Sequence, residues 1–362
     1  MVDYIGCARV QELVAAKGAA RFIEELAAEI QADYSRWNDF DKSPRHATHS
    51  SGGVIELMPT SDGHRYSFKY VNGHPKNTAA GLLTVTAFGV LADVATGYPL
   101  LLSEMTYVTA LRTAAMSVAA AQRMARPTSR VMALIGNGAQ SEFQAIAFHA
   151  LLGIRELRLY DTDPGATAKL VRNLAALGLT DLKVIPCACT ADAVRGADIV
   201  TTVTADKCNA LILTPDMIRP GMHLNAVGGD CPGKTELHPD ILRRPDLRIV
   251  VEFEAQARIE GEIQQLDPSA AVIEFADVVR GTQFGRAGEA EVTLFDSVGF
   301  ALNDFSALRY LQRLNRAQRN AQMIDLVPSL DDPKDLFGGL VGKPSPAQQR
   351  PAPRSARERS VA

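Results

Sequence analysis

A carboxylate at a glycine-rich turn is the first feature of this sequence with the residue types and spacing for chemistry. In NAVGGDCPG, residues 225–233, an apolar segment runs into Gly228, Gly229 and Asp230, so a carboxylate stands in a sharply turning loop after an expected strand. Ligands of open parallel sheets bind at the carboxyl ends of strands. Asp230 is therefore a candidate general acid or base, and a turn aspartate without a chemical role is the alternative.

A second glycine turn, GNGAQS at residues 136–141, has the spacing of a phosphate-binding turn. In the dinucleotide-binding fold the first glycine permits the tight turn, the second lets the backbone approach a pyrophosphate, and the third allows close helix packing. Gly136 and Gly138 take the first two places, and Ser141 stands in the third. A strand is expected before the turn and a helix after it, and amides at a helix N-terminus can receive a phosphate. The turn therefore predicts a dinucleotide site.

Asp161 is the acidic partner that such a site needs. It ends the next expected strand, ELRLYD at residues 156–161, where a carboxylate can accept hydrogen bonds from an adenosine ribose. The same carboxylate would repel a 2′-phosphate, which favours NAD over NADP. The alternative is that Asp161 only caps the turn DTDPG.

Cations that suit an anionic substrate lie upstream of both turns. In RYSFKY, residues 65–70, strand alternation puts Lys69 on the face opposite the aromatic side chains, and Glu56 points away from its apolar neighbours in GVIELMP. Neighbouring strands would then place Glu56 and Lys69 on a shared polar face. Arg45 and Arg112 add guanidinium groups, whose planar fork fits a carboxylate. These side chains predict a carboxylate clamp, and solvated surface charges are the alternative.

Two kinds of sequence pattern surround these residues. From residue 131 onward, expected strands at 131–135, 156–161, 182–186 and 198–205 alternate with helical segments, of which 166–178 is the longest. This order predicts a doubly wound parallel sheet. Before residue 128, the segments 53–59, 65–73 and 81–104 are typical of consecutive strands, with turns at 62–63, 72–73 and 96–99, and a helix is expected at 111–125. This part predicts a separate antiparallel or mixed sheet.

Length and composition limit the function further. A chain of 362 residues exceeds what one hydrophobic core usually supports, so two domains are expected. The formal net charge of −3 gives no bias toward nucleic acid or an acidic membrane surface and favours a small polar substrate. No membrane span or signal peptide is visible, so a cytoplasmic location with reduced cysteines is expected. The sequence shows no set of three or four suitable ligands, so no metal site is expected.

Eight segments together resemble one known family: SFKYVNGHP, ALRTAAMS, LIGNGAQSEFQA, YDTDP, NAVGGDCPGKTEL, RIEGEIQQL, FDSVGFALND and DDPKDLF. They look like the bacterial ornithine cyclodeaminases of the ornithine cyclodeaminase and mu-crystallin family. The likeness runs from about residue 40 to residue 337 and is more specific than any single motif. Ser141 in the glycine turn is the usage of this family, so the turn is a variant of the fingerprint.

The resemblance implies an α/β chain with two domains. A Rossmann-type doubly wound NAD domain would span residues 128–307. Residues 1–127 and a returning segment at 308–340 would form an α+β domain for substrate binding and dimerisation, with homodimers joined through its sheet. Residues 341–362, rich in proline, arginine and serine, are expected to form a disordered basic tail. No nucleic-acid or membrane partner is expected.

The resemblance also implies roles for single residues. Arg45, Lys69 and Arg112 would hold the carboxylate of the substrate, with Val298 beside it. Glu56 would handle protons near the amine, and Asp230 would be the main acid/base. Contacts to NAD would come from Thr84, Arg112, Gly136, Gly138, Ala139, Gln140, Asp161, Thr204, Val227, Gly228, Lys234 and Ser297.

The reaction of the family turns L-ornithine into L-proline and ammonia, with NAD accepting a hydride and returning it in each turnover. Lysine cyclisation stays an alternative, because one methylene in the substrate is worth only about 1–3 kcal/mol of discrimination. An NAD-dependent amino-acid or imino-acid dehydrogenase is a second alternative. A non-catalytic binding protein, as the crystallin members suggest, is the alternative of another class, and the loss of the acid/base would be its signature. Asp230 is present here.

Overall fold

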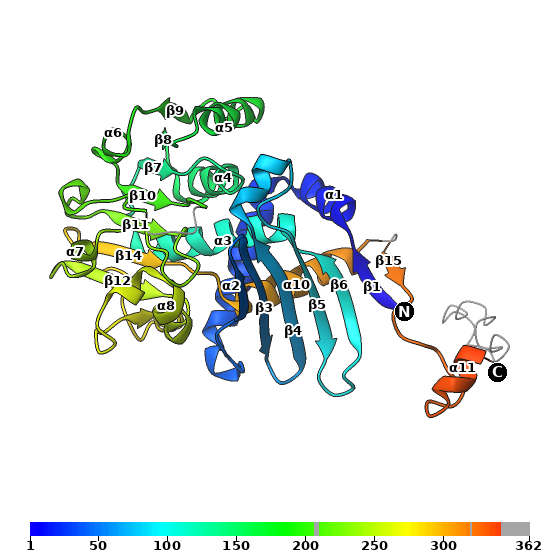
Figure 1. The fold of residues 1–362 in the computed structure, drawn as a ribbon. Coiled ribbons are helices and arrows are strands. Elements are labelled where there is room, and N and C mark those ends of the chain that lie inside the picture. Colours follow the sequence, from blue (N-terminus) through cyan, green and yellow to red (C-terminus); the bar gives the residue numbers. More distant parts are fainter. Residues whose placement is uncertain (206–209, 319–320, 342–362) are drawn as a thin grey trace, which may run out of the picture.

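The computed structural model describes residues 1–205, 210–318 and 321–341, which form two sheets with helices between and around them (Figure 1). The first sheet has seven strands in the order β15-β1-β6-β5-β4-β3-β2. They are β1 (Val2–Ile5), β2 (His46–Ser50), β3 (Gly53–Ser61), β4 (Arg65–Gly73), β5 (Ala87–Asp93), β6 (Pro99–Glu104) and β15 (Gln322–Ile324). All neighbours are antiparallel except β1 and β6. The mixed sheet confirms the prediction for this part of the chain.

Strands β3 and β4 bury their polar face and leave their aromatic face open. Their register places Glu56 and Lys69 on one face, as predicted. Helix α10 (Ala301–Arg316) packs on β3 and β4, and there Glu56 is 6% and Lys69 0% exposed. On the opposite face Tyr66 is exposed, and the ring of Tyr70 stacks on Phe88 of β5. The usual amphipathic order of a sheet is therefore inverted at these positions.

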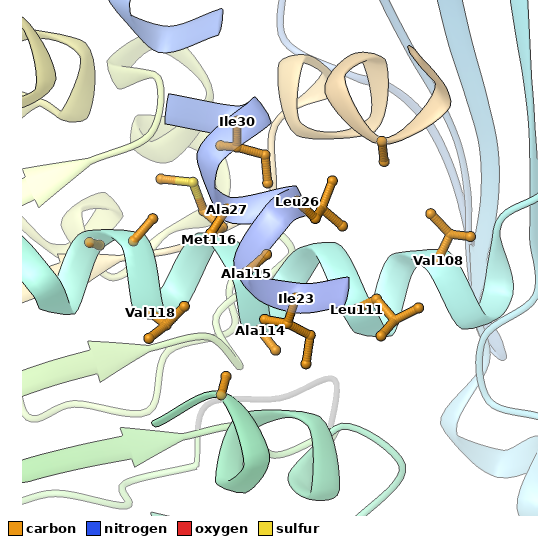
Figure 2. Packing of buried hydrophobic residues seen from close by; sticks show 14 of the residues in the cluster. Ile23, Leu26, Ala27, Ile30, Val108, Leu111, Ala114, Ala115, Met116 and Val118 are labelled. Atoms are coloured by element: carbon orange, nitrogen blue, oxygen red, sulfur yellow. The ribbon is translucent and has the colours of Figure 1, made fainter. Parts of the chain in front are cut away.

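A layer of helices fills the space between the two sheets. Helix α1 (Cys7–Lys17) leads into α2 (Ala19–Ser35), which crosses α3 (Thr106–Met124), and both of these pack against α10 (Figure 1). Figure 2 shows α2, with Ile23, Leu26 and Ile30, crossing α3 at its small residues Ala114 and Ala115. Alanine lets the two helices approach closely. Helix α3 also contacts strands of the second sheet, so it joins the two halves of the molecule.

The second sheet is parallel throughout and confirms the doubly wound fold class. Its eight strands have the order β13-β12-β14-β11-β10-β7-β8-β9. They are β7 (Val131–Ile135), β8 (Glu156–Tyr160), β9 (Lys183–Pro186), β10 (Ile199–Thr202), β11 (His223–Ala226), β12 (Leu247–Val251), β13 (Ile273–Glu274) and β14 (Val292–Asp296). The helices along this part are α4 (Ser141–Leu152), α5 (Pro164–Ala176), α6 (Thr190–Val194), α7 (Pro239–Leu242), α8 (Glu254–Glu260) and α9 (Phe275–Arg280).

Two local expectations differ from the structure, and one region had no prediction. Two helices, α1 and α2, precede residue 40, in a stretch for which no element was predicted. The turn expected at residues 72–73 is wrong, because both residues belong to β4 and Asn72 Oδ1 accepts a hydrogen bond from Thr86 N at 2.8 Å. The strand expected from residue 81 begins only at Ala87, after a 3₁₀ helix, η2 (Pro75–Ala80).

Helix α10 carries the chain back to the first sheet. It is continuous across residue 308, where the return was expected, so the second crossing between the sheets begins at Ala301. The division into domains otherwise stays a prediction. Strand β15 and the short helix α11 (Leu336–Val341) follow, and the tail expected at 341–362 lies outside the described residues except for Val341. No helix in the described part of the chain has the length and apolar character needed to cross a bilayer.

Candidate active site

The carboxyl edge of the second sheet gathers most of the predicted cofactor residues. Gly136 follows β7, Asp161 follows β8, Thr204 lies after β10, Val227 follows β11 and Ser297 follows β14. Since all these strands are parallel, the five positions lie along one edge. This is the edge at which open parallel sheets bind ligands.

The glycine turn between β7 and α4 has a backbone that side chains would obstruct. Gly136 has φ +93, and a Cβ there would lie 2.8 Å from the carbonyl oxygen of Val203. A Cβ on Gly138 would meet nothing within 4 Å, so the turn is open on that side. Ser141 is buried and its Oγ donates to Gly138 O at 2.7 Å, which closes the turn onto the first residue of α4. The turn therefore has the free space and the helix N-terminus that a pyrophosphate requires.

Asp161 is bonded to this turn as well as to its own loop. Its Oδ2 accepts from Asn137 N at 2.6 Å, and its Oδ1 accepts from Asp163 N at 2.8 Å. The N-cap of α5 is Asp163, whose Oδ1 accepts from Gly165 N at 2.8 Å. Capping of the helix thus belongs to Asp163, and Asp161 links the end of β8 to the glycine turn.

The loop that follows β11 holds Asp230 at the same edge. The side chain of Asp230 is 41% exposed, and its Oδ1 lies 3.3 Å from Nζ of Lys234, which is 1% exposed. Lys234 also donates to the carbonyl oxygen of Thr204 at 2.8 Å. One buried ammonium group therefore joins the loop after β10 to a carboxylate that stays accessible.

Glu236, for which no role was predicted, reinforces that junction. It is 1% exposed, and its Oε1 accepts from Thr204 N at 3.0 Å and from the Thr204 hydroxyl. Its Oε2 accepts from Gly228 N at 3.2 Å, and a Cβ on Gly228 would overlap the carboxylate. A single carboxylate thus ties together two loops that carry predicted cofactor residues.

Further acids lie behind Glu236. Glu262 accepts from the backbone N of Glu236 at 2.7 Å, and Asp296 accepts from Ile263 N at 3.0 Å. Burial raises the pKa of Asp296 to about 7 and raises that of Glu262 well above its ordinary value. These acids hold backbone amides, and no group of three or more potential metal ligands comes together among residues 1–205, 210–318 and 321–341.

Arg45, which precedes β2 of the first sheet, reaches the turn after β14 of the second sheet. Its Nη1 donates to Glu56 at 2.9 Å, its Nε lies 3.0 Å from Glu260, and its Nη2 donates to the carbonyl oxygens of Val298 and Gly299 at 2.5 and 2.6 Å. Burial lowers the pKa of the guanidinium, but the negative charges of Glu56, Glu260 and Asp230 outweigh burial and raise it. Arg45 therefore stays a cation, and its charge interacts favourably with that of Asp230.

Lys69 and Arg112 share one buried partner, Asp304. Nζ of Lys69 lies 2.9 Å from both oxygens of Asp304, and Nε of Arg112 donates to Oδ1 at 3.0 Å. Lys69 is 0%, Asp304 1% and Arg112 6% exposed. Burial and the charge of Arg112 lower the pKa of Lys69 to about 8, while Asp304 acts in the opposite direction.

The turn after β14 brings the two groups of charges together. Gly299 has φ +78, its carbonyl oxygen accepts from Arg45, and a Cβ on it would lie 2.9 Å from Nη1 of Arg112. Val298, the predicted substrate neighbour, is buried beside it. Arg45 and Arg112 thus both reach this turn, at the carboxyl end of a strand of the second sheet, with Glu56 bonded to Arg45 and Lys69 beside Arg112 on Asp304.

Other predicted residues lie around this centre with fewer contacts. Gln140 donates to the carbonyl oxygen of Ala110 in α3, two residues before Arg112, at 3.0 Å, while Ala139 is exposed. Among the hydrogen bonds of the described residues, those of Thr84 involve only Asn72 and His74, and its carbonyl oxygen accepts from His74 N at 2.8 Å. Ser297 is buried, and its N donates to Ala226 O at 2.8 Å.

Comparison with known proteins assigns this arrangement to a family. Residues 9–318 match the ornithine cyclodeaminase/mu-crystallin family. The chain belongs to this family. It is 57% identical over 341 residues to an ornithine cyclodeaminase of Agrobacterium fabrum (strain C58), a match that covers 94% of this chain and 95% of the relative. The resemblance drawn from the eight segments is therefore confirmed.

Solved structures agree with this assignment. A lysine cyclodeaminase described in terms of its recognition of L-lysine, L-ornithine and L-2,4-diaminobutyric acid superposes with a TM-score of 0.86 at 28% identity, covering 93% of this chain and 98% of that one. An archaeal alanine dehydrogenase dimer with bound NAD gives a TM-score of 0.81 at 26% identity, covering 90% and 99%. The fold thus accompanies more than one reaction of amino acids.

Proposed function

We propose that this chain converts L-ornithine to L-proline and ammonia, the reaction of a cyclising ammonia-lyase, with NAD as its cofactor. One observation carries the proposal: buried cations for a carboxylate and an open glycine turn lie on the same sheet edge as the accessible Asp230 carboxylate. The identity of 57% to an ornithine cyclodeaminase supports ornithine over the other substrates of the fold.

The cofactor would lie along the carboxyl edge of the second sheet. The open turn at Gly138 leaves room for the pyrophosphate, and the α4 N-terminus supplies amides. Asp161 would accept hydrogen bonds from the adenosine ribose, which favours NAD over NADP. Further contacts are proposed for Thr84, Arg112, Gly136, Ala139, Gln140, Thr204, Val227, Gly228, Lys234 and Ser297. NAD supplies a hydride acceptor that is restored within each turnover.

The buried cations would hold the substrate by its carboxylate. Within the described residues, Asp304 is the hydrogen-bond partner of the Arg112 side chain and engages Nε, which leaves both terminal nitrogens of the guanidinium to receive a carboxylate. Lys69 stands beside it on the same Asp304. Glu56, held by Arg45, would accept a hydrogen bond from the amine of the substrate. Val298 would pack against the carbon chain.

Asp230 would move the proton that ring closure requires. An alkylammonium has no lone pair, so the δ-amine of ornithine must lose a proton before its nitrogen can attack. The Asp230 carboxylate, which lies 3.3 Å from Nζ of Lys234, can accept that proton. Holding the two ends of one substrate near each other gives the ring closure a large advantage over a reaction between separate molecules.

We also propose a homodimer joined through the open face of the first sheet. That face exposes Ile55, Leu57, Tyr66 and Phe88, each at least 39% exposed. Contiguous apolar side chains on a sheet face are typical of an interface between subunits. The alanine dehydrogenase that shares the fold is described as a dimer.

The test is an assay that follows ammonia, proline and reduced nicotinamide together. With NAD well below the enzyme concentration, we expect ammonia and proline to form from ornithine in equal amounts, without lasting absorbance of reduced nicotinamide. A keto acid with accumulating NADH would instead show a net dehydrogenase. Absence of any turnover with retained NAD binding would show a non-catalytic binding protein. Side-by-side kinetics on ornithine and lysine decide between the two cyclodeaminase substrates.

A further inference from the structure

Asp304 is a buried carboxylate with two cationic partners and no part in the proton chemistry proposed above. It lies in the first turn of α10, whereas Lys69 lies on β4 and Arg112 on α3. Lys69 and Arg112 are 235 and 192 residues before Asp304 in the chain, and a nitrogen of each lies within 3.0 Å of its carboxylate. Such a cluster is held by tertiary packing alone.

We propose that Asp304 is a positioning residue, whose carboxylate fixes the Lys69 ammonium and the Arg112 guanidinium in the arrangement that receives the carboxylate of an amino-acid substrate. Asp304 is 1% exposed and lies behind both cations, so it acts through them. The proposal rests on the proposed function only in taking an α-amino acid as the ligand.

The geometry explains why both cations need a fixed partner. The bond from Nε to Asp304 sets the plane of the Arg112 guanidinium, and the direction of its two terminal nitrogens follows from that plane. Lys69 has a flexible stem, and contact of Nζ with both oxygens of Asp304 restricts it to one position. Without Asp304, two like charges would face each other in a buried space, which disfavours both.

The negative charge of Asp304 also affects the protonation of Lys69, which must be protonated to attract a carboxylate. The charged groups around it are Asp304 on α10, Arg112 on α3, Arg45 before β2 and Glu56 on β3. Burial and Arg112 bring the pKa of Lys69 down to about 8, and Asp304 opposes them. Removal of the Asp304 charge therefore lowers the pKa of Lys69 further, and the cation is lost at a lower pH.

The experiment compares wild type with Asp304→Asn and Asp304→Glu in steady-state kinetics on L-ornithine, from pH 6 to pH 10. For Asp304→Asn we expect KM to rise about tenfold or more, with a smaller change in kcat, because hydrogen bonds to charged groups hold the cations. The basic limb of kcat/KM, which reports the free enzyme, should move to lower pH. The substrate ionises identically in all assays, so a shift between variants belongs to the protein.

The second variant separates charge from position. Asp304→Glu keeps the negative charge but moves it by one methylene, so KM should rise while the pH profile stays close to that of wild type. If Asp304→Asn fails to fold, this variant still tests the positioning role. An unchanged KM in either folded variant, or a basic limb that stays in place in Asp304→Asn, would overturn the proposal.

A matched control is available on the same helix layer. Asp33 is also 1% exposed, and it accepts from Ser306 at 2.6 Å and from Arg309 at 2.7 Å, both on α10. Asp33→Asn should lower stability but leave the KM and the pH profile unchanged, whereas Asp304→Asn changes both. If wild type forms no proline, the proposed function fails, and calorimetric titration of L-ornithine into wild type and Asp304→Asn in the presence of NAD still tests Asp304. Equal affinities would then reject its role.

Discussion

The glycine turn after β7 is formed mainly by backbone groups, whereas the cation cluster around Asp304 is formed by charged side chains. At the turn, backbone groups of one strand-turn-helix unit face the ligand side, and the key contacts are the close approach of Gly136 to Val203 and the open space at Gly138. In the cluster, charged side chains from β4, α3 and α10 meet on a single carboxylate. The residues of the turn are consecutive in the chain, whereas those of the cluster come from three distant segments.

The two sites differ in the energetic cost of forming them. A turn needs only a backbone conformation that glycine adopts without strain. A buried cation must be compensated, because an unpaired charge in the interior is costly. Arg45, Lys69 and Arg112 are accordingly matched by Glu56, Glu260 and Asp304. Changes in the cluster should therefore alter substrate binding and stability together, whereas changes in the turn should act mainly on the cofactor.

The largest effect is expected at Asp230, which stands between the two sites. Asp230→Asn should lower turnover at least ~100-fold, because a positioned acid/base contributes about that much. Its side chain is 41% exposed, so stability and NAD binding should change little. Ammonia release and NAD titration measure the two properties. Unchanged turnover would remove Asp230 from the mechanism and leave the cluster alone to explain activity.

A smaller effect, specific to the turn, is expected for a pair of alanine variants. Gly136→Ala should destabilise the protein without NAD, since the left-handed backbone alone costs about 1–2 kcal/mol and a Cβ would approach Val203 O at 2.8 Å. Gly138→Ala has free space, so its Tm without NAD should match wild type while the rise in Tm on adding NAD becomes smaller. Thermal melts with and without NAD measure both, and equal behaviour of the two variants would contradict the comparison.

The smallest effect is expected at Asp161. Asp161→Asn removes a charge whose oxygens accept from Asn137 N and Asp163 N. We expect the affinity for NAD to fall roughly tenfold, as for other hydrogen bonds to charged groups, and the preference for NAD over NADP to narrow. Titrations with both nucleotides, together with the KM for ornithine as a control from the substrate side, measure the change. A constant ratio of the two affinities would show that Asp161 serves the turn only.

Much of the fold was predictable because its signals are local. Alternation of side chains in residues 65–70 correctly placed Lys69 opposite the aromatic side chains, and the order of strands and helices after residue 131 correctly predicted a parallel sheet. Helix α2 was missed although Phe22, Ile23, Leu26 and Ile30 recur at helical spacing. The turn predicted at residues 72–73 was wrong because Thr86, from another segment, holds Asn72 in β4.

The candidate site was only partly predictable. Cations and acids that precede or follow glycine-rich segments could be named, and the structure places Arg45, Glu56, Lys69 and Arg112 close together. Two buried carboxylates of the site were not predicted. Glu236 lies within NAVGGDCPGKTEL and Asp304 within FDSVGFALND, so the only signal was their place in segments already singled out. Nothing in such a segment says which distant side chain a carboxylate will meet.

By itself the sequence determined the parallel sheet after residue 131, the glycine turn and the identity of the family, because each depends on residues near one another in the chain or on a pattern spread over most of its length. Only the tertiary structure decided that a lysine on an aromatic strand is fully buried and that Asp304 serves two cations at once. The physical reason is that burial and charge pairing depend on packing between β4, α3 and α10, which no local pattern specifies.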